Sequence, residues 1–433
     1  MLGTFAKAFR TPDLRRKLLF TISIMVLFRV GSFVPTPGVD PAAIDAIQEQ
    51  SQSSDLLGLI NLFSGGGLLQ LSVFALGIMP YITASIIVQL LRVVIPRFET
   101  LHKEGQSGQT KLTQYTRYLT IALAVLQSTV VITTARTGAL FGTVSSDIQV
   151  IDPDTPWTLT LMIIVMTAGT GLIMWLGELI TEKGVGNGMS LLIFTSIVAG
   201  FPASLGQIWG STNGVTNLIV VLIVFVAVIG AIVFVEQSQR RIRVQYAKRM
   251  VGGRTLGGGT NYIPMKINTA GVIPIIFASS LLSLPTMFTQ FSADPSNAFV
   301  VWIQRNFSST DPLYMVLYGA LTIFFCFFYT AITFNPQEVA DNMMKYGGFI
   351  PGIRAGRPTA EYLNYVITRI TTPGSIYLAV VALVPQVLFG LLGITQNLPF
   401  GGTTLLIIVG VGLDTVKQIE AQLEQRHYGG FLR

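Results

Sequence analysis

The chain has 433 residues, of which 51% are hydrophobic and only 11% are charged. Soluble domains carry about 25% charged residues, so this chain has too few to cover a surface exposed to water. The composition therefore excludes an ordinary soluble protein and indicates a membrane protein. Cys326 is the single cysteine, which excludes an internal disulfide, and the two histidines, His102 and His427, are far apart in sequence, which argues against a histidine metal site.

The chain begins with a basic segment, and apolar residues follow from Leu18 to Val34. This arrangement resembles a signal peptide, but no small-residue cleavage site ends it and more apolar segments follow. We therefore expect a first membrane helix here, kept in the mature protein.

Further apolar segments follow along the whole chain. About 20 apolar residues cross the hydrocarbon core of a bilayer as a helix. Ten segments of this kind predict ten membrane spans, near residues 18–34, 69–92, 118–137, 157–179, 188–204, 215–235, 270–289, 313–333, 373–393 and 400–416.

Lysine and arginine lie almost entirely on one side of these spans. The exceptions are Arg136 and Arg305, at or near the other side, and Arg29, within the first span. Cytosolic loops carry the excess of basic residues in membrane proteins. We therefore expect both termini to face the cytosol, together with the loops 93–117, 180–187, 236–269 and 334–372.

The second and seventh predicted spans share a sequence pattern. One contains Gly77-Ile-Met-Pro-Tyr-Ile-Thr-Ala-Ser and the other Gly271-Val-Ile-Pro-Ile-Ile-Phe-Ala-Ser. Five residue types recur at the same spacing, and the charge rule gives the two spans opposite directions. The pattern predicts two inverted halves, residues 1–204 and 205–433, each with five spans. Chance similarity between apolar segments is the alternative.

Each of these two spans contains a proline, Pro80 or Pro274, that removes a helix hydrogen bond and leaves a carbonyl free. In a membrane this is tolerated only beside protein or water. We therefore expect the two spans to line the interior and to face each other between the halves.

Residues 56–67 form a short apolar segment that ends in three glycines, Gly65 to Gly67. The apolar part is too short to span the membrane, and the glycines permit a sharp reversal of the chain. We expect a re-entrant helix hinged at glycine. A helix lying on the membrane surface is the alternative.

Motifs along nearly the whole chain resemble those of the SecY/Sec61-alpha family, the central subunits of protein-translocation channels. In chain order they are Phe63-Ser-Gly-Gly, Phe74-Ala-Leu-Gly-Ile-Met-Pro-Tyr-Ile, Lys103-Glu-Gly, Gln114-Tyr-Thr-Arg-Tyr, Trp175-Leu-Gly-Glu, Ile180-Thr-Glu-Lys-Gly-Val-Gly-Asn-Gly, Tyr246-Ala-Lys-Arg, Ala270-Gly-Val-Ile-Pro, Phe325-Cys-Phe-Phe-Tyr-Thr, Phe334-Asn-Pro, Pro351-Gly-Ile-Arg and Gly401-Gly-Thr.

The resemblance implies an all-α membrane protein with ten transmembrane helices. Two inverted five-helix halves would surround a central hourglass pore, and the segment at about 56–67 would be a re-entrant plug helix that closes the pore at rest. The plug residues implied by motif position are Leu57, Leu59, Ile60, Asn61, Leu62, Phe63, Ser64, Gly65 and Gly66.

The resemblance also implies a ring of apolar side chains at the pore constriction. Side chains four apart share one helix face, a spacing that fits a ring and is equally usual in ordinary packing. A narrow apolar constriction dewets and resists ion flow. The implied ring residues are Ile78, Ile82, Met189, Ile193, Ile276 and Ile407, of which Met189 departs from the expected branched aliphatic residue.

The opening between the second and seventh spans resembles the family's lateral gate, through which signal sequences and membrane helices reach lipid. The third and eighth spans would flank it. An amide in an apolar span needs a partner, so an internal helix–helix hydrogen bond is the alternative role of Gln127. The candidate gate residues are Pro80, Thr83, Gln127, Asn268 and Pro274.

The basic loops at about 236–269 and 334–372 are longer than topology alone requires. The resemblance assigns both to docking of the SecA motor ATPase or the ribosome, whose RNA is an acidic partner. Positive charge that merely keeps loops in the cytosol is the alternative for some residues. The candidate docking residues are Arg240, Arg241, Arg243, Lys248, Arg249, Pro351, Gly352, Arg354 and Arg357.

Further implied partners are the small membrane subunits SecE and SecG, signal sequences and nascent chains, membrane lipid, and the accessory proteins SecD, SecF and YidC. The implied location is the bacterial cytoplasmic membrane. SecA would hydrolyse the ATP, so we expect no catalytic residue, metal or cofactor in this chain.

Two other classes of membrane protein share some of these features. Secondary transporters have inverted repeats, but coupled transport usually needs ionisable groups at midplane. The spans offer few, among them Arg29 near the first and Glu178 and Asp414 near span ends. An intramembrane enzyme needs a buried acid pair, a Ser/His pair or a histidine metal site, and both histidines lie outside the spans.

Overall fold

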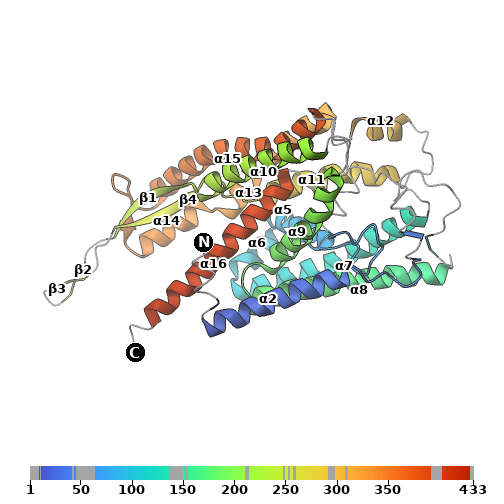
Figure 1. Ribbon diagram of the computed structural model, residues 1–433. Coiled ribbons are helices and arrows are strands. Elements are labelled where there is room, and N and C mark those ends of the chain that lie inside the picture. The colour runs from blue at the N-terminus through green and yellow to red at the C-terminus, as the bar shows by residue number, and fades with distance from the viewer. Residues whose placement is uncertain are drawn as a thin grey trace.

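Long helices run side by side through most of the molecule in the computed structural model, and a small sheet projects from one end (Figure 1). The structure describes residue 9 and residues 11–40, 43–44, 64–136, 150–151, 155–209, 214–246, 249–251, 254–256, 260–290, 298–307, 311–391 and 402–429.

Every predicted span coincides with a helix. In chain order these helices are α2 (Pro12–Gly31), α5 (Met79–Val94), α7 (Gln106–Arg136), α8 (Pro156–Lys183), α9 (Gly188–Trp209), α10 (Gly214–Gln237), α11 (Ile273–Gln290), α13 (Pro312–Thr333), α15 (Arg357–Leu391) and α16 (Gly402–Gly429). In the described part of the chain, shorter helices also lie between them, namely α6 (Pro96–Lys103), α12 (Ala298–Asn306) and α14 (Pro336–Lys345).

Length and composition alone qualify five helices in the described part of the chain to cross a membrane. The pair Met79–Arg92 and Pro96–Lys103, bent by 98°, would make a sixth, and Gly188–Pro202 and Ile273–Leu282 are shorter apolar helices. Large apolar side chains such as Val226 and Val316 are 67% and 70% exposed. Exposed apolar surface on this scale fits helices that face lipid rather than water.

The two halves pack their helices in the same order. In the first half α5 packs on α7, α7 on α8 and α8 on α9, and in the second half α11 packs on α13, α13 on α15 and α15 on α16. The first and fifth span helices of each half also touch, as α2 with α9 and α10 with α16. The halves meet where α9 packs against α10 and α16. This correspondence supports the predicted internal repeat.

The matched prolines stand at equivalent places, but not where a helix hydrogen bond is lost. Pro80 and Pro274 each occupy the second position of a helix, where the missing N–H would have no partner in any case. The glycine three residues before each proline has positive φ, 56° at Gly77 and 64° at Gly271. The expectation that each proline leaves a carbonyl free is therefore wrong. What recurs in the two halves is the start of a helix after a glycine of positive φ.

The helix of the second span begins at Met79, later than the predicted residue 69, because residues 64–77 form a series of turns. These turns are buried, and the neighbouring chain satisfies their backbone. Leu71 O accepts from Thr36 N at 3.0 Å and from Thr36 Oγ1 at 2.7 Å, and Val73 N donates to Val34 O at 2.9 Å. Irregular backbone at membrane depth is tolerated when protein covers it in this way.

The two basic loops combine into one small domain, which the sequence pattern did not predict. Strands β1 (Gln239–Tyr246) and β4 (Thr260–Lys266) come from the first loop and β5 (Gly348–Phe349) from the second, in the antiparallel order β4-β1-β5. Ile242 and Val244 point into a core shared with α14 and α15. Strands β2 (Arg249–Val251) and β3 (Arg254–Leu256) pair separately beyond this sheet (Figure 1).

Helix α2 begins, and α16 ends, at the end of the molecule where the sheets lie, whereas α12 lies at the opposite end (Figure 1). This placement agrees with the expectation that both termini and the basic loops share one side of the membrane.

Candidate functional site

One apolar cluster contains side chains from both halves of the molecule. It includes all six residues proposed for the constriction ring, of which Ile78 comes just before α5 and the others lie on α5, α9, α11 and α16. Ile78, Ile193 and Ile407 are 2%, 6% and 2% exposed, and the remaining three are half-buried. The structure therefore brings together residues from helices that are far apart in sequence.

The helix starts at Gly77 and Gly271 place two of these residues at equivalent positions. On α5, Ile82 N donates to Ile78 O at 3.1 Å, and on α11, Ile276 N donates to Val272 O at 3.3 Å. Helix α16 approaches the same turn of α11, since a Cβ built on Gly410 would lie 3.2 Å from Val272 Cγ2. Ile82 and Ile276 therefore occupy equivalent positions in the two halves, and both belong to the same cluster.

The glycine-rich segment between α8 and α9 sets the position of α9. Asn187 Oδ1 accepts from Met189 N at 3.1 Å and caps the helix. A Cβ built on Gly188 would lie 1.9 Å from Gly177 O, so the two helix backbones are in close contact. Met189 Sδ lies against Gly177 of α8, where a built Cβ would be 2.4 Å away. The Met189 side chain therefore packs along α8 at the edge of the cluster.

The plug segment is described only at its C-terminal end. Leu57, Leu59, Ile60, Asn61, Leu62 and Phe63 lie outside the described residues. Ser64 is fully buried, and Ser64 Oγ accepts from Leu68 N at 3.0 Å. Gly65 and Gly66 have φ values of 68° and 91°, which only glycine adopts readily. Both glycines therefore adopt a backbone conformation suited to the expected reversal of the chain, which stays a prediction.

The candidate gate residues fall into two groups. Pro80 and Thr83 lie on α5 and Gln127 lies half-buried on α7, which packs against α5. Thr83 Oγ1 donates to its own helix, to Met79 O at 3.0 Å. Pro274 is buried in the first turn of α11.

Asn268, the other gate candidate, lies in the connection from β4 to α11 and is 3% exposed. Its Nδ2 donates to Glu236 Oε1 at 2.5 Å, at the end of α10, and to Gly271 O at 3.2 Å. The contacts of this amide therefore tie the end of α10 to the segment just before α11.

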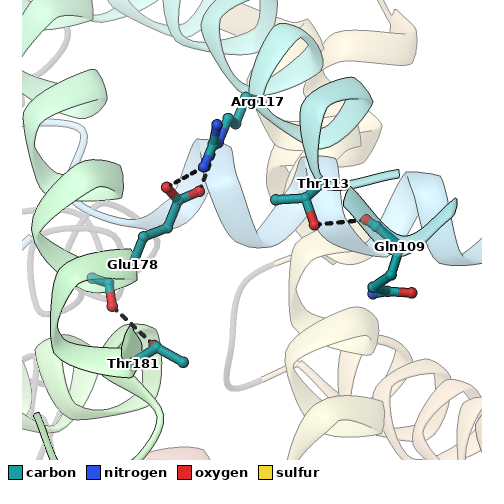
Figure 2. A network of polar contacts seen from close by, with 6 residues as sticks. Gln109, Thr113, Arg117, Glu178 and Thr181 are labelled. Carbon is teal, nitrogen blue, oxygen red and sulfur yellow. Dashed lines mark hydrogen bonds and ion pairs between the residues drawn. The ribbon is translucent and has the colours of Figure 1, made fainter. Parts of the chain in front are cut away.

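Two family motifs meet in an ion pair that the sequence reasoning missed. Arg117 on α7 donates to Glu178 on α8 through Nε at 2.9 Å and Nη2 at 2.6 Å (Figure 2). The side chains are 37% and 24% exposed. The sequence does contain one feature that could have indicated this pair: a basic and an acidic residue in adjacent spans, each at an end of its apolar stretch.

The docking candidates lie on the small domain. Arg240, Arg241 and Arg243 are exposed along β1. Pro351, Gly352, Arg354 and Arg357 are exposed in the turn before α15 and at its first residue. Arg249 lies in β2, and Lys248 falls outside the described residues. Because Gln245 of β1 pairs with Phe349 of β5, the arginines of β1 and the residues that follow β5 belong to one small domain.

Within the described residues, no group of three or more His, Cys, Asp or Glu side chains is placed to hold a metal ion.

The family model for SecY matches residues 72–416. The chain belongs to the SecY family. The protein translocase subunit SecY of Streptomyces scabiei is 59% identical over 438 residues, which cover 100% of both chains. The subunit of the same name from Streptomyces galbus is 58% identical over 441 residues, again covering 100% of both.

Solved structures with the SecY fold superpose on most of this chain. A structure described as a protein conducting channel has a TM-score of 0.64 at 18% identity, covering 94% of this chain and 91% of that one. A SecY structure described by its plug domain and a canine Sec61 structure from a ribosome–channel complex both have a TM-score of 0.62 with the same identity and coverage. These similarities confirm the predicted fold class.

Proposed function

We propose that this chain is the pore-forming subunit of a protein-translocation channel. It passes unfolded secretory polypeptides across the bacterial cytoplasmic membrane and releases membrane segments sideways into lipid. The observation that carries the proposal is the apolar cluster of Ile78, Ile82, Met189, Ile193, Ile276 and Ile407, to which both halves contribute. The names of the relatives, protein translocase subunits, support the same function.

The cluster acts as the constriction of the pore. Aliphatic side chains at a narrow point exclude water and therefore ions, and they make no hydrogen bonds that a particular substrate sequence would have to satisfy. Such side chains can close around a moving polypeptide of any sequence. Met189, which packs along α8, contributes a flexible thioether at the edge of this seal.

The segment 56–67 closes the pore at rest. Its hinge is the glycine pair Gly65 and Gly66, whose positive φ values let the chain reverse. One similar structure carries the description that the plug domain of SecY stabilises the closed state and maintains a membrane seal, which supports the same role here.

The lateral gate lies between α5 and α11, with Pro80, Thr83, Gln127 and Pro274 beside it. Both helices start after a glycine of positive φ, at Gly77 and Gly271, so each can tilt about a flexible residue at its first turn. Asn268, bonded to Glu236 and Gly271, holds the segment just before α11 to the end of α10.

The small domain with the exposed arginines of β1 and Arg354 is the docking surface for the SecA motor or the ribosome. A similar Sec61 structure comes from a ribosome–channel complex, and acidic ribosomal RNA suits a basic surface. SecE and SecG complete the membrane complex, both termini face the cytosol, and ATP is hydrolysed by SecA. This chain is a channel and not an enzyme.

Crosslinking tests the pore assignment. A secretory polypeptide stalled during export should crosslink to a photoreactive residue placed at position 82, 193 or 276. The matched control is a photoreactive residue at exposed Val226 on α10, which faces away from the cluster. Absence of crosslinks at all three cluster positions, with export otherwise active, would overturn the assignment.

A second measurement separates a channel from a secondary transporter. Deletion of residues 57–67 should make reconstituted vesicles leaky to ions, because the constriction loses its cover. In a transporter the same deletion would abolish solute uptake without a leak.

A further inference from the structure

Arg29 is a basic residue inside the first span, and none of the roles proposed above uses it. It lies near the C-terminal end of α2, between Phe28, which is fully buried, and Val30, which is 60% exposed. A charged side chain in an apolar span is costly unless it has a partner, so its presence indicates a specific contact.

Among the described residues, the guanidinium of Arg29 contacts Gly65 and Phe33. Arg29 Nη1 donates a hydrogen bond to Gly65 O, in the hinge of the plug segment. Its Cζ also lies 4.5 Å from the centroid of the Phe33 ring, one turn along the chain. The ring holds the cation in place, and one N–H group reaches the hinge.

The hinge itself is enclosed by α2 and α9. A Cβ built on Gly65 would lie 3.0 Å from Arg29 Nη1 and 3.6 Å from Ser196 Cα. Ser196 follows Ile193, a member of the apolar cluster, by less than one turn of α9. By contrast, a Cβ built on Gly66 would meet no atom of the described residues within 4 Å. The contact with Arg29 is therefore specific to one of the two hinge glycines.

We propose that Arg29 is a latch that holds the hinge of the plug against α2 and α9 in the resting channel. The inference rests on the proposed plug function of residues 56–67. The acceptor is a neutral carbonyl and not a carboxylate, so water can replace it when the plug moves without stranding a second charge. The Phe33 ring then keeps the guanidinium in position for reclosure.

The latch predicts a measurable ion leak. A hydrogen bond from a charged donor shifts a two-state equilibrium by roughly ten- to a hundredfold. Arg29→Leu in the full channel complex, reconstituted into planar bilayers, should raise the open fraction at rest by about tenfold or more. Arg29→Lys, which keeps the charge but loses the planar fork, should restore part of the seal. Val30→Ala, on the exposed face of the same turn, should leave the conductance unchanged.

The two hinge glycines provide a matched pair that does not depend on the folding of Arg29 variants. Alanine at either position is strained by the positive φ, but only Gly65→Ala also presses on Arg29. We expect Gly65→Ala to leak more than Gly66→Ala. Combining Arg29→Leu with Gly65→Ala should raise the leak by less than the sum of the two single changes, because only the strain from the positive φ then remains at position 65, whereas Arg29→Leu with Gly66→Ala should be additive.

These measurements distinguish the proposed role of Arg29 as a latch from the proposed plug function of residues 56–67. Equal leaks from the two glycine variants, or additivity of Arg29→Leu with Gly65→Ala, would overturn the latch. A leak on deletion of 57–67 with no leak from Arg29→Leu would overturn the latch and leave the plug assignment standing. No leak from the deletion would overturn both.

Discussion

At the scale of single residues, sequence spacing predicts which side chains share a helix face, but it does not predict which faces of different helices meet. Ile78 and Ile82 lie on one face because they are four apart, and that fact could be derived without any fold. Their position beside Ile193, Ile276 and Ile407 depends on how four helices pack. For that step the sequence offered only the family resemblance.

Arg117 and Glu178 illustrate the same limit. Each was recognisable as a charged residue near the end of a span, but nothing in the local pattern paired them. The structure joins them by two hydrogen bonds across α7 and α8, beside α5. The ion pair stabilises the packing of α7 on α8 only while both partners are present.

We predict that Arg117→Leu lowers the free energy of unfolding by about 1–3 kcal/mol, because Glu178 loses its partner in a partly buried site. Glu178→Gln should cost a similar amount. The double variant should cost less than the sum of the two, since neither group is then left as an unpaired charge. Thermal unfolding of the purified complex in detergent provides the measurement, and strict additivity would contradict the pairing.

At the scale of elements, the existence of the spans could be predicted because a run of apolar residues is a local property. The starts of α5 and α11 could not. Pro80 and Pro274 were expected to interrupt helices, yet each follows a glycine of positive φ and opens a helix. Before α5, residues 64–77 form turns that hydrogen-bond to the chain at 34–36, a tertiary contact that hydropathy does not encode.

The corner between α8 and α9 is the element that places Met189 and Ile193. Gly188→Ala should force these helices apart, since the added Cβ would collide with the backbone at Gly177. We expect a loss of about 1–3 kcal/mol in unfolding free energy, typical of an overpacked site, together with a higher resting ion conductance.

The control is Gly230→Ala on α10, where an added Cβ meets nothing within 4 Å. Alanine in a helix interior is favoured over glycine by about 0.5–1 kcal/mol, so this variant should be slightly stabilised and sealed. A Gly188→Ala variant as stable as the parent would show that the close approach of the two helices is not needed.

At the scale of the whole molecule, the two basic loops could be predicted from charge, but the sheet that they form together could not. Strand β5 has two residues, too few for any alternating pattern, and its pairing with β1 joins segments that α11 to α14 separate in sequence. The consequence is that the proposed docking surface and the proposed constriction belong to different parts of the chain. The exposed arginines lie on the small domain, and the apolar cluster lies among the span helices.

This separation makes Arg354→Glu informative. The turn that carries Arg354 is held by its backbone, since Arg354 O accepts from Thr359 Oγ1 at 2.8 Å and Gly352 has a φ of 86°. The exposed side chain can therefore change sign without unfolding the turn. We expect SecA-driven translocation into reconstituted vesicles to fall about tenfold or more, as when a hydrogen-bonded charge at an interface is lost, with resting ion conductance unchanged. Arg369→Glu, an equal charge change on exposed α15, should have a smaller effect. Normal ATP-dependent translocation by Arg354→Glu would refute its docking role.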